Sequence, residues 1–159
     1  MLFTKFFVTS GKGVSKTSSL NAFDKALVEA RIDQCNLVPV SSILPQNATP
    51  VDYARIPAGS ITFCVLARQD GRQGQSIGAG VAWAMCEGLE IKERFGIVAE
   101  EHARHGNEEK IKKSLLKKLA EMASARNMKI IEHKTEAVTL KKIPSKNHGT
   151  VVAALVYTN

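Results

Sequence analysis

Aromatic residues are scarce in this chain of 159 residues, at 6% with a single tryptophan, and no hydrophobic run is long enough to cross a bilayer. The apolar residues 2–8 include Lys5 and lack a small-residue cleavage site, so they predict a first strand rather than a signal peptide. A chain of this size can form one hydrophobic core. We therefore expect a single domain over residues 1–159 and no membrane partner.

Cysteine is also rare, and the three that occur, Cys35, Cys64 and Cys86, are widely spaced among apolar neighbours. An odd number at this spacing does not suggest a disulfide framework or a zinc site, and indicates free thiols in a reducing, cytoplasmic compartment. His102 and His105 could share a helical face, but no third ligand stands at a metal-site spacing. We expect no metal.

Acidic residues are outnumbered, 15 against 22 basic ones, which gives a net charge of +7. Excess positive charge favours nucleic acid, but residues 110–142, where the lysines concentrate, contain no aromatic side chain to stack on bases. Residues 107–126 predict an amphipathic helix with an apolar stripe opposite the lysines. The stripe consists of Ile111, Leu115, Leu119 and Met122. We expect this helix to cover a sheet, and no nucleic acid partner.

Two common motifs are incomplete. Residues 10–19 resemble a phosphate-binding loop, but Ser15 stands where a glycine is required, which excludes a nucleotide site there. Gly74-Gln75-Ser76-Ile77-Gly78 matches the nucleophile elbow of serine hydrolases, but a strand pattern rather than a helix follows Ser76, and no aspartate occurs after it. Because a glutamate–histidine pair could replace the aspartate, a hydrolase remains an alternative.

Hydrophobic periodicity predicts about seven strands and two helices, which is typical of an α+β domain. The strands are expected at residues 3–9, 37–44, 60–68, 76–86, 95–100, 129–143 (one or two strands) and 150–158, and the helices at 21–32 and 107–126. Residues 10–19 are expected to form a loop. Asn21 is the expected N-cap of the first helix, with Asp24 completing a capping-box-like arrangement. One apolar face of that helix would comprise Leu20, Phe23, Leu27 and Ala30.

The segment that most strongly suggests a chemical function is residues 37–45. It is an apolar run of strand character between two prolines, with Ser41 and Ser42 at its centre. Most such serine pairs are ordinary turn or strand residues. A serine whose Oγ can reach the preceding carbonyl carbon can instead attack its own backbone. The peptide bond becomes an ester, and elimination and hydrolysis leave an N-terminal pyruvoyl group, which is an electron sink for covalent catalysis.

The surrounding residues resemble the pyruvoyl-dependent arginine decarboxylase family. The resemblance is carried by residues 11–14, 20–27 and 36–45, and by the strand 96–100 that ends in an acid. It implies an αββα sandwich of largely antiparallel sheets with flanking helices. It also implies cleavage between Ser41 and Ser42 into residues 1–41 (beta chain) and 42–159 (alpha chain), decarboxylation of L-arginine to agmatine, and a homotrimer with active sites between protomers.

The resemblance also implies roles for individual residues. Ser42 would become the pyruvoyl group, so that neither pyridoxal phosphate nor a metal is needed, and Glu100 would be the proton donor. Asn36 would assist cleavage of the Ser41–Ser42 bond. The substrate-binding residues would be Asp24, which would bind the guanidinium, together with Leu20, Leu27, Ser41 and Ile43. The alternatives are a pyruvoyl decarboxylase for another amino acid and a non-processed, non-catalytic homologue.

Overall fold

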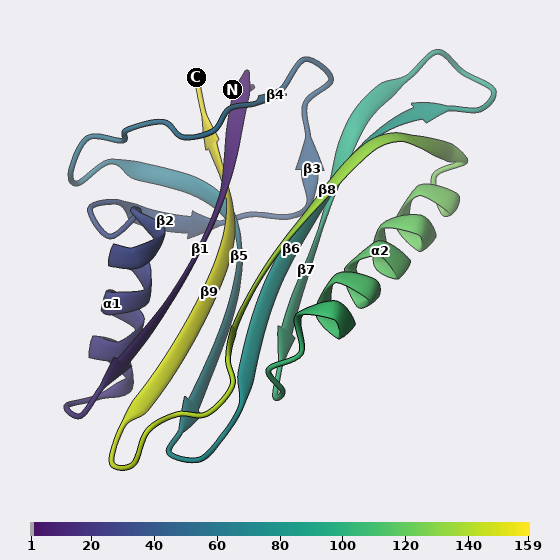
Figure 1. Ribbon diagram of the computed structural model, residues 1–159. Coiled ribbons are helices and arrows are strands. Elements are labelled where there is room, and N and C mark those ends of the chain that lie inside the picture. Colours follow the sequence, from purple (N-terminus) through teal and green to yellow (C-terminus); the bar gives the residue numbers. More distant parts are fainter. Residues whose placement is uncertain (1) are drawn as a thin grey trace.

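Two β-sheets lie face to face, with one helix against the outer face of each (Figure 1). The computed structural model describes residues 2–159. Its elements are β1 (Lys5–Ser15), α1 (Ser19–Ala30), β2 (Asn36–Pro39), β3 (Ile43–Leu44), β4 (Thr49–Pro50), β5 (Ile61–Arg72), β6 (Ile77–Gly88), β7 (Arg94–Ala103), α2 (Glu108–Ser124), β8 (Met128–Leu140) and β9 (His148–Thr158). This arrangement confirms the predicted αββα sandwich of the α+β class.

The first sheet has the strand order β2-β5-β9-β1-β4, and the second has the order β3-β7-β6-β8. Most neighbouring strands are antiparallel, whereas the short strands β2 and β4 run parallel to β5 and β1. The longest ladder in the first sheet pairs all of β1 with β9, from Lys5 opposite Thr158 to Ser15 opposite His148. The amino-terminal strand is therefore an interior member of the sheet.

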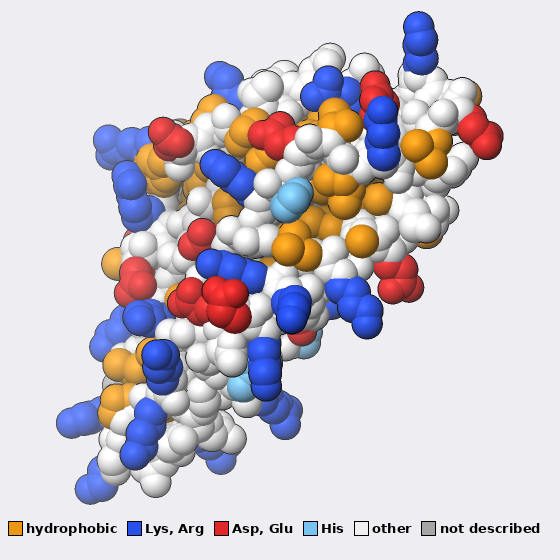
Figure 2. Space-filling model, turned by 45° about the vertical axis from the view of Figure 1, so that its right-hand side comes forward, with side chains coloured by type: hydrophobic (Ala, Val, Ile, Leu, Met, Phe, Trp, Pro, Cys, Tyr) orange, Lys and Arg blue, Asp and Glu red, His pale blue; other side chains and the backbone are white. Residues whose placement is uncertain are grey.

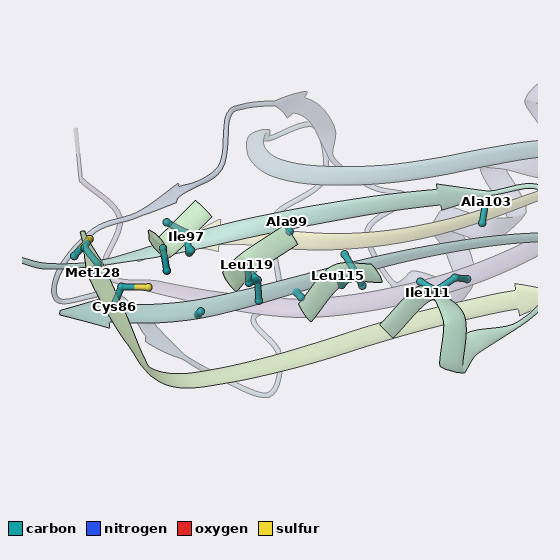
Figure 3. Close-up of a cluster of buried hydrophobic side chains, with 11 residues drawn as sticks. Cys86, Ile97, Ala99, Ala103, Ile111, Leu115, Leu119 and Met128 are labelled. Carbon is teal, nitrogen blue, oxygen red and sulfur yellow. The ribbon is translucent and has the colours of Figure 1, made fainter. Parts of the chain in front are cut away.

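Helix α2 covers the second sheet, as its apolar stripe predicts. Ile111, Leu115 and Leu119 are buried against β6 and β7 (Figure 3). The helix begins after Asn107, whose side chain accepts a hydrogen bond from the backbone N–H of Lys110 and so caps the first turn. Figure 2, which brings this side of the molecule forward, shows Lys and Arg side chains spread over the surface, with acidic side chains among them over its middle and upper parts. The lysines thus belong to the solvated face of a helix that packs on a sheet.

The first strand is longer than predicted, because β1 continues through Ser15 where the sequence suggests a loop from Ser10. The two glycines in this extension allow α1 to lie directly on the strand. A Cβ added at Gly11 would be 2.1 Å from the carbonyl oxygen of Ala26, and one at Gly13 would be 2.2 Å from that of Ala22. Glycine is required here by the close approach of two backbones.

The same contact corrects the predicted packing face of α1. The fully buried side chains are Ala22, Ala26 and Ala30, whereas Leu20 is 70% exposed. The N-cap is also different. Ser18 Oγ accepts the backbone N–H of Asn21 (3.1 Å), so Asn21 lies inside the helix. Asp24 consequently has no capping role, and its side chain is exposed.

The substitution Gly11→Ala is expected to destabilise the fold by about 1–3 kcal/mol or more, because the added methyl group cannot avoid the backbone of α1. Chemical denaturation followed by circular dichroism would measure this change. Lys12→Ala is the matched control, since Lys12 lies between the two glycines and is exposed. Equal unfolding free energies for the two variants would contradict the close contact.

Candidate active site

Residues 36–44 pass from the first sheet to the second. The Ser41–Ser42 peptide lies at the point where the chain leaves one sheet and enters the other. Before it, β2 pairs with β5, and the N–H of Val40 donates to the carbonyl of Cys64 (2.9 Å). After it, β3 pairs with β7, and the N–H of Val98 donates to the carbonyl of Ser42 (2.9 Å). The prediction of one continuous strand over residues 37–44 is therefore wrong. The serine pair is the link between two short strands in different sheets.

Two further hydrogen bonds surround this link. The N–H of Ile43 donates to the carbonyl oxygen of Ser41 (3.2 Å), and the hydroxyl of Tyr157 donates to the carbonyl oxygen of Ile43 (3.0 Å). Tyr157 is only 5% exposed. Burial, and secondarily the nearby Cys64, raise the pKa of Tyr157 to about 12, so the hydroxyl keeps its proton at neutral pH.

Ser42 and Glu100 line one open pocket of about 450 Å³. Strand β7 supplies one wall, and α2 with the two residues after it supplies the other. The remaining lining residues are Val98, Ala99, Lys118, Glu121, Met122, Ala125 and Arg126. The structure therefore brings together two of the predicted residues, the second serine of the pair and a carboxylic acid.

The neighbouring acid, Glu101, is held in place by other side chains. It accepts a hydrogen bond from the hydroxyl of Ser114 and forms an ion pair with Lys118 (2.8 Å). Burial alone would raise the pKa of Glu101, but the bonds from Lys118 and Ser114 outweigh it and lower the pKa. Lys118 also donates to the backbone carbonyl of Glu100 (2.8 Å). Glu101 is thus an ionised anchor between α2 and β7.

The predicted substrate-binding residues of α1 lie elsewhere in the chain's own fold. Asp24, Leu20 and Leu27 are on the outer layer of the first sheet, and none of them lines the pocket of Ser42. Figure 1 shows α1 and α2 on opposite sides of the sandwich. Within a single protomer, the structure does not bring these side chains to the serine pair.

Asn36 is also distant from the bond it was expected to help cleave. It begins β2, and its side-chain amide donates to the carbonyl of Gly59 (2.9 Å). Ser41 is five residue steps further along the chain, which corresponds to roughly 16 Å in extended conformation at about 3.3 Å per residue. Asn36 therefore does not contact the Ser41 carbonyl of its own chain.

Ser41 and Ile43 line a second, apolar pocket of about 530 Å³, which shares no lining residue with the pocket of Ser42. Ile43 is 44% exposed despite its apolar side chain. The other lining residues are Leu2, Phe3, Val40, Pro45, Phe63 and Tyr157. The serine pair thus borders one pocket that contains charged side chains and one apolar pocket. Sequence reasoning did not single out Tyr157, because one tyrosine near the end of an apolar strand carries no distinctive signal.

Some features of the sequence lead to no site. Ser76 directly precedes β6, so a strand follows it and the helix of a nucleophile elbow is absent there. Within residues 2–159, no three His, Cys, Asp or Glu side chains are grouped as metal ligands. In the same part of the chain, no helix has the length and apolar character needed to span a membrane. The three cysteines are free.

Comparison with known proteins decides the family. The model of the family described as pyruvoyl-dependent arginine decarboxylase matches residues 5–159. The chain belongs to this family. A pyruvoyl-dependent arginine decarboxylase of Methanopyrus kandleri is 37% identical over 154 residues, which are 96% of this chain and 95% of that protein. One from Methanothermobacter thermautotrophicus is 35% identical over 159 residues, with the same coverage of both chains.

Membership of the pyruvoyl-dependent arginine decarboxylases implies a pyruvoyl prosthetic group and a small-molecule substrate. The residues present fit such a group. Ser42 is a serine with a peptide carbonyl before it, it lies at a bend outside both ladders, and it lines a pocket that also contains Glu100. The family resemblance carried by the serine pair and its neighbours is confirmed.

Proposed function

We propose that this protein decarboxylates L-arginine to agmatine and carbon dioxide, using a pyruvoyl group formed from Ser42. The observation that carries the proposal is the position of the Ser41–Ser42 peptide at the crossover between the sheets, with Ser42 and Glu100 in one pocket. The names of the relatives supply the substrate. Because the pyruvoyl ketone provides the electron sink, the proposal needs neither pyridoxal phosphate nor a metal.

Formation of the group begins at Ser42. Its Oγ forms a bond with the Ser41 carbonyl carbon, the C–N bond breaks, and the hydroxyl proton passes to the amide nitrogen. Loss of the Ser42 α-proton then expels the Ser41 carboxylate, and water releases the nitrogen as ammonia. The products are residues 1–41, the beta chain, and residues 42–159, the alpha chain, which together make up the single domain.

In the decarboxylation, the residues of the chain bind the substrate and transfer a proton. Glu100 would donate a proton to the substrate's α-carbon after carbon dioxide leaves, which is general acid catalysis. Ser41 and Ile43 would contact the substrate beside the reacting end. Asp24 would accept two parallel N–H bonds from the guanidinium, while Leu20 and Leu27 flank the methylene chain.

The substrate-binding residues of α1 and the residues around the serine pair can form one site only between protomers. In its own chain α1 lies on the opposite side of the sandwich from the pocket of Ser42. Exposed apolar side chains on α1 and beside the serine pair support protein contacts at both places. They are Leu20, Val28, Val38, Val40 and Ile43. We therefore propose a homotrimer with active sites between protomers. The three free thiols support a cytoplasmic location.

Intact mass and product analysis test the function. The purified protein should consist of two fragments divided at Ser41–Ser42, and arginine should yield agmatine and carbon dioxide. A panel of amino acids distinguishes a decarboxylase with another substrate. A single full-length mass without turnover would establish the non-processed homologue instead. Labelling of Ser76 by a fluorophosphonate would indicate the hydrolase.

The substitution Asp24→Asn is expected to lower kcat/KM for arginine about 10- to 100-fold, mainly through KM, because a charge-assisted pair with the guanidinium is lost. Cleavage should be unaffected. Steady-state assays of carbon dioxide release measure the effect, with Asp33→Asn, an exposed acid after α1, as the matched control.

Mixed assemblies of Asp24→Asn with Ser42→Ala should regain about a quarter of the sites if each site takes these residues from different protomers. No recovery would argue against the shared site.

A further inference from the structure

The carbonyl that Ser42 would attack already has a hydrogen-bond donor within its own chain. The N–H of Ile43 lies 3.2 Å from the carbonyl oxygen of Ser41. When an oxygen nucleophile adds to a carbonyl carbon, negative charge develops on the carbonyl oxygen, and a donor fixed beside that oxygen stabilises the transition state. Asn36, which the family resemblance links to cleavage, donates its side-chain amide to the carbonyl of Gly59 instead.

The direction of the Ile43 N–H is set by Val98. The peptide unit that carries this N–H also carries the carbonyl of Ser42, which accepts the N–H of Val98 at 2.9 Å. In a planar trans peptide the C=O and N–H point in opposite directions. The bond from Val98 holds the Ser42 carbonyl oxygen toward β7 and so directs the N–H of Ile43 toward the carbonyl oxygen of Ser41. The same bond polarises the peptide unit that carries this N–H.

Tyr157 fixes the next peptide unit. Its hydroxyl donates to the carbonyl oxygen of Ile43 at 3.0 Å, and its ring packs on Phe3 with the ring centroids 5.4 Å apart. Tyr157 belongs to β9 in the first sheet, whereas Ile43 begins β3 in the second. This bond thus connects the sheets directly after the scissile peptide and prevents Ile43 from rotating away.

We propose that the backbone N–H of Ile43 stabilises the charge on the Ser41 carbonyl oxygen during self-cleavage, and that Tyr157 is the positioning residue that holds this donor. The inference rests on the proposed function. It concerns the first step only, in which the Ser42 Oγ–carbon bond forms and the C–N bond breaks. The rate of that step can be measured without any assay of decarboxylation.

The first test compares the two tyrosines of the chain. Tyr157→Phe removes the hydroxyl and keeps the ring, and Tyr53→Phe is the matched control, since its hydroxyl donates to the carbonyl of Arg31 (3.3 Å), away from the link. Intact mass over time after cell-free synthesis gives the cleavage rate. We expect about a tenfold slower cleavage for Tyr157→Phe and no change for Tyr53→Phe. Thermal unfolding of both variants identifies any loss of folding.

The second test removes the donor itself. Replacing residue 43 by the α-hydroxy acid analogue of isoleucine converts its N–H to an ester oxygen and should slow cleavage about 100-fold. The same exchange at Val40, whose N–H bonds Cys64, is the control, because it weakens the same segment without touching the Ser41 carbonyl. Equal rates for the two esters would overturn the inference, even if Tyr157→Phe failed to fold. Absence of cleavage in the wild type would instead refute the proposed function.

Discussion

Replacing Ser42 by alanine should leave one intact polypeptide of 17.3 kDa that releases no carbon dioxide from arginine. The substitution removes the Oγ that attacks the Ser41 carbonyl, so neither the chain break nor the ketone can form. Denaturing electrophoresis, intact mass and labelling with a carbonyl reagent measure cleavage, and carbon dioxide release measures activity. Both should fall to background.

Ser41→Ala is the matched control for this prediction. It changes the side chain on the other side of the same bond and keeps the carbonyl that is attacked, so cleavage should continue. The two variants have nearly the same volume change at adjacent, accessible positions, which separates a chemical effect from a loss of packing. Cleavage in Ser42→Ala, or turnover by uncleaved protein, would contradict the proposed chemistry.

Glu100→Gln should cleave normally but lose about 10²- to 10⁴-fold in kcat, the range typical of a missing general acid. An amide cannot supply the proton that replaces carbon dioxide on the α-carbon, whereas it fills nearly the same space in the pocket. Single-turnover measurements on fully processed protein would give the rate of the chemical step and confirm that substrate still binds.

Glu101→Gln is the control for Glu100, because the two acids are adjacent and differ in their surroundings. The pKa of Glu101 is lowered from its ordinary value of 4.5 in the folded protein. Its bonds therefore stabilise the fold at pH values above 4.5, and this stabilisation is lost as the pH falls through the lower pKa of the folded state. Glu101→Gln should therefore lose stability at neutral pH and most of this acid sensitivity, while kcat changes little. A larger loss of kcat at Glu101 than at Glu100 would reverse the assignment.

Much of the fold could be predicted from local patterns. The stripe at Ile111, Leu115 and Leu119 predicts α2 to within two residues at each end, because an amphipathic helix must bury that face. Alternation in residues 60–68 predicts β5, whereas β6 and β9 are predicted as runs of small or apolar residues and are buried on both faces. The serine pair predicts the site because the two residues that the proposed cleavage requires are adjacent in the sequence.

Other features depend on contacts that no local pattern contains. An apolar run such as residues 37–44 has strand character whichever sheet it joins, so the change of sheet at Ser42 is set by β5 and β7, its partners far along the chain. Gly11 and Gly13 suggest a loop in isolation, and only the alanines of α1 explain them as strand residues. The role proposed for Asp24 depends on a contact between protomers, which no pattern within one chain can predict.

The position of β1 inside its sheet predicts what would happen to residues 1–41 after the proposed cleavage. Residues 1–41 hold β1, α1 and β2, and β1 is bordered on both sides by strands from residues 42–159. Removing this piece would break the full eleven-residue ladder to β9 and expose the core beneath α1. The proposed cleavage would therefore create a new chain end at Ser42 while the domain stays folded. The two polypeptides should co-purify as one particle and separate only under denaturing conditions.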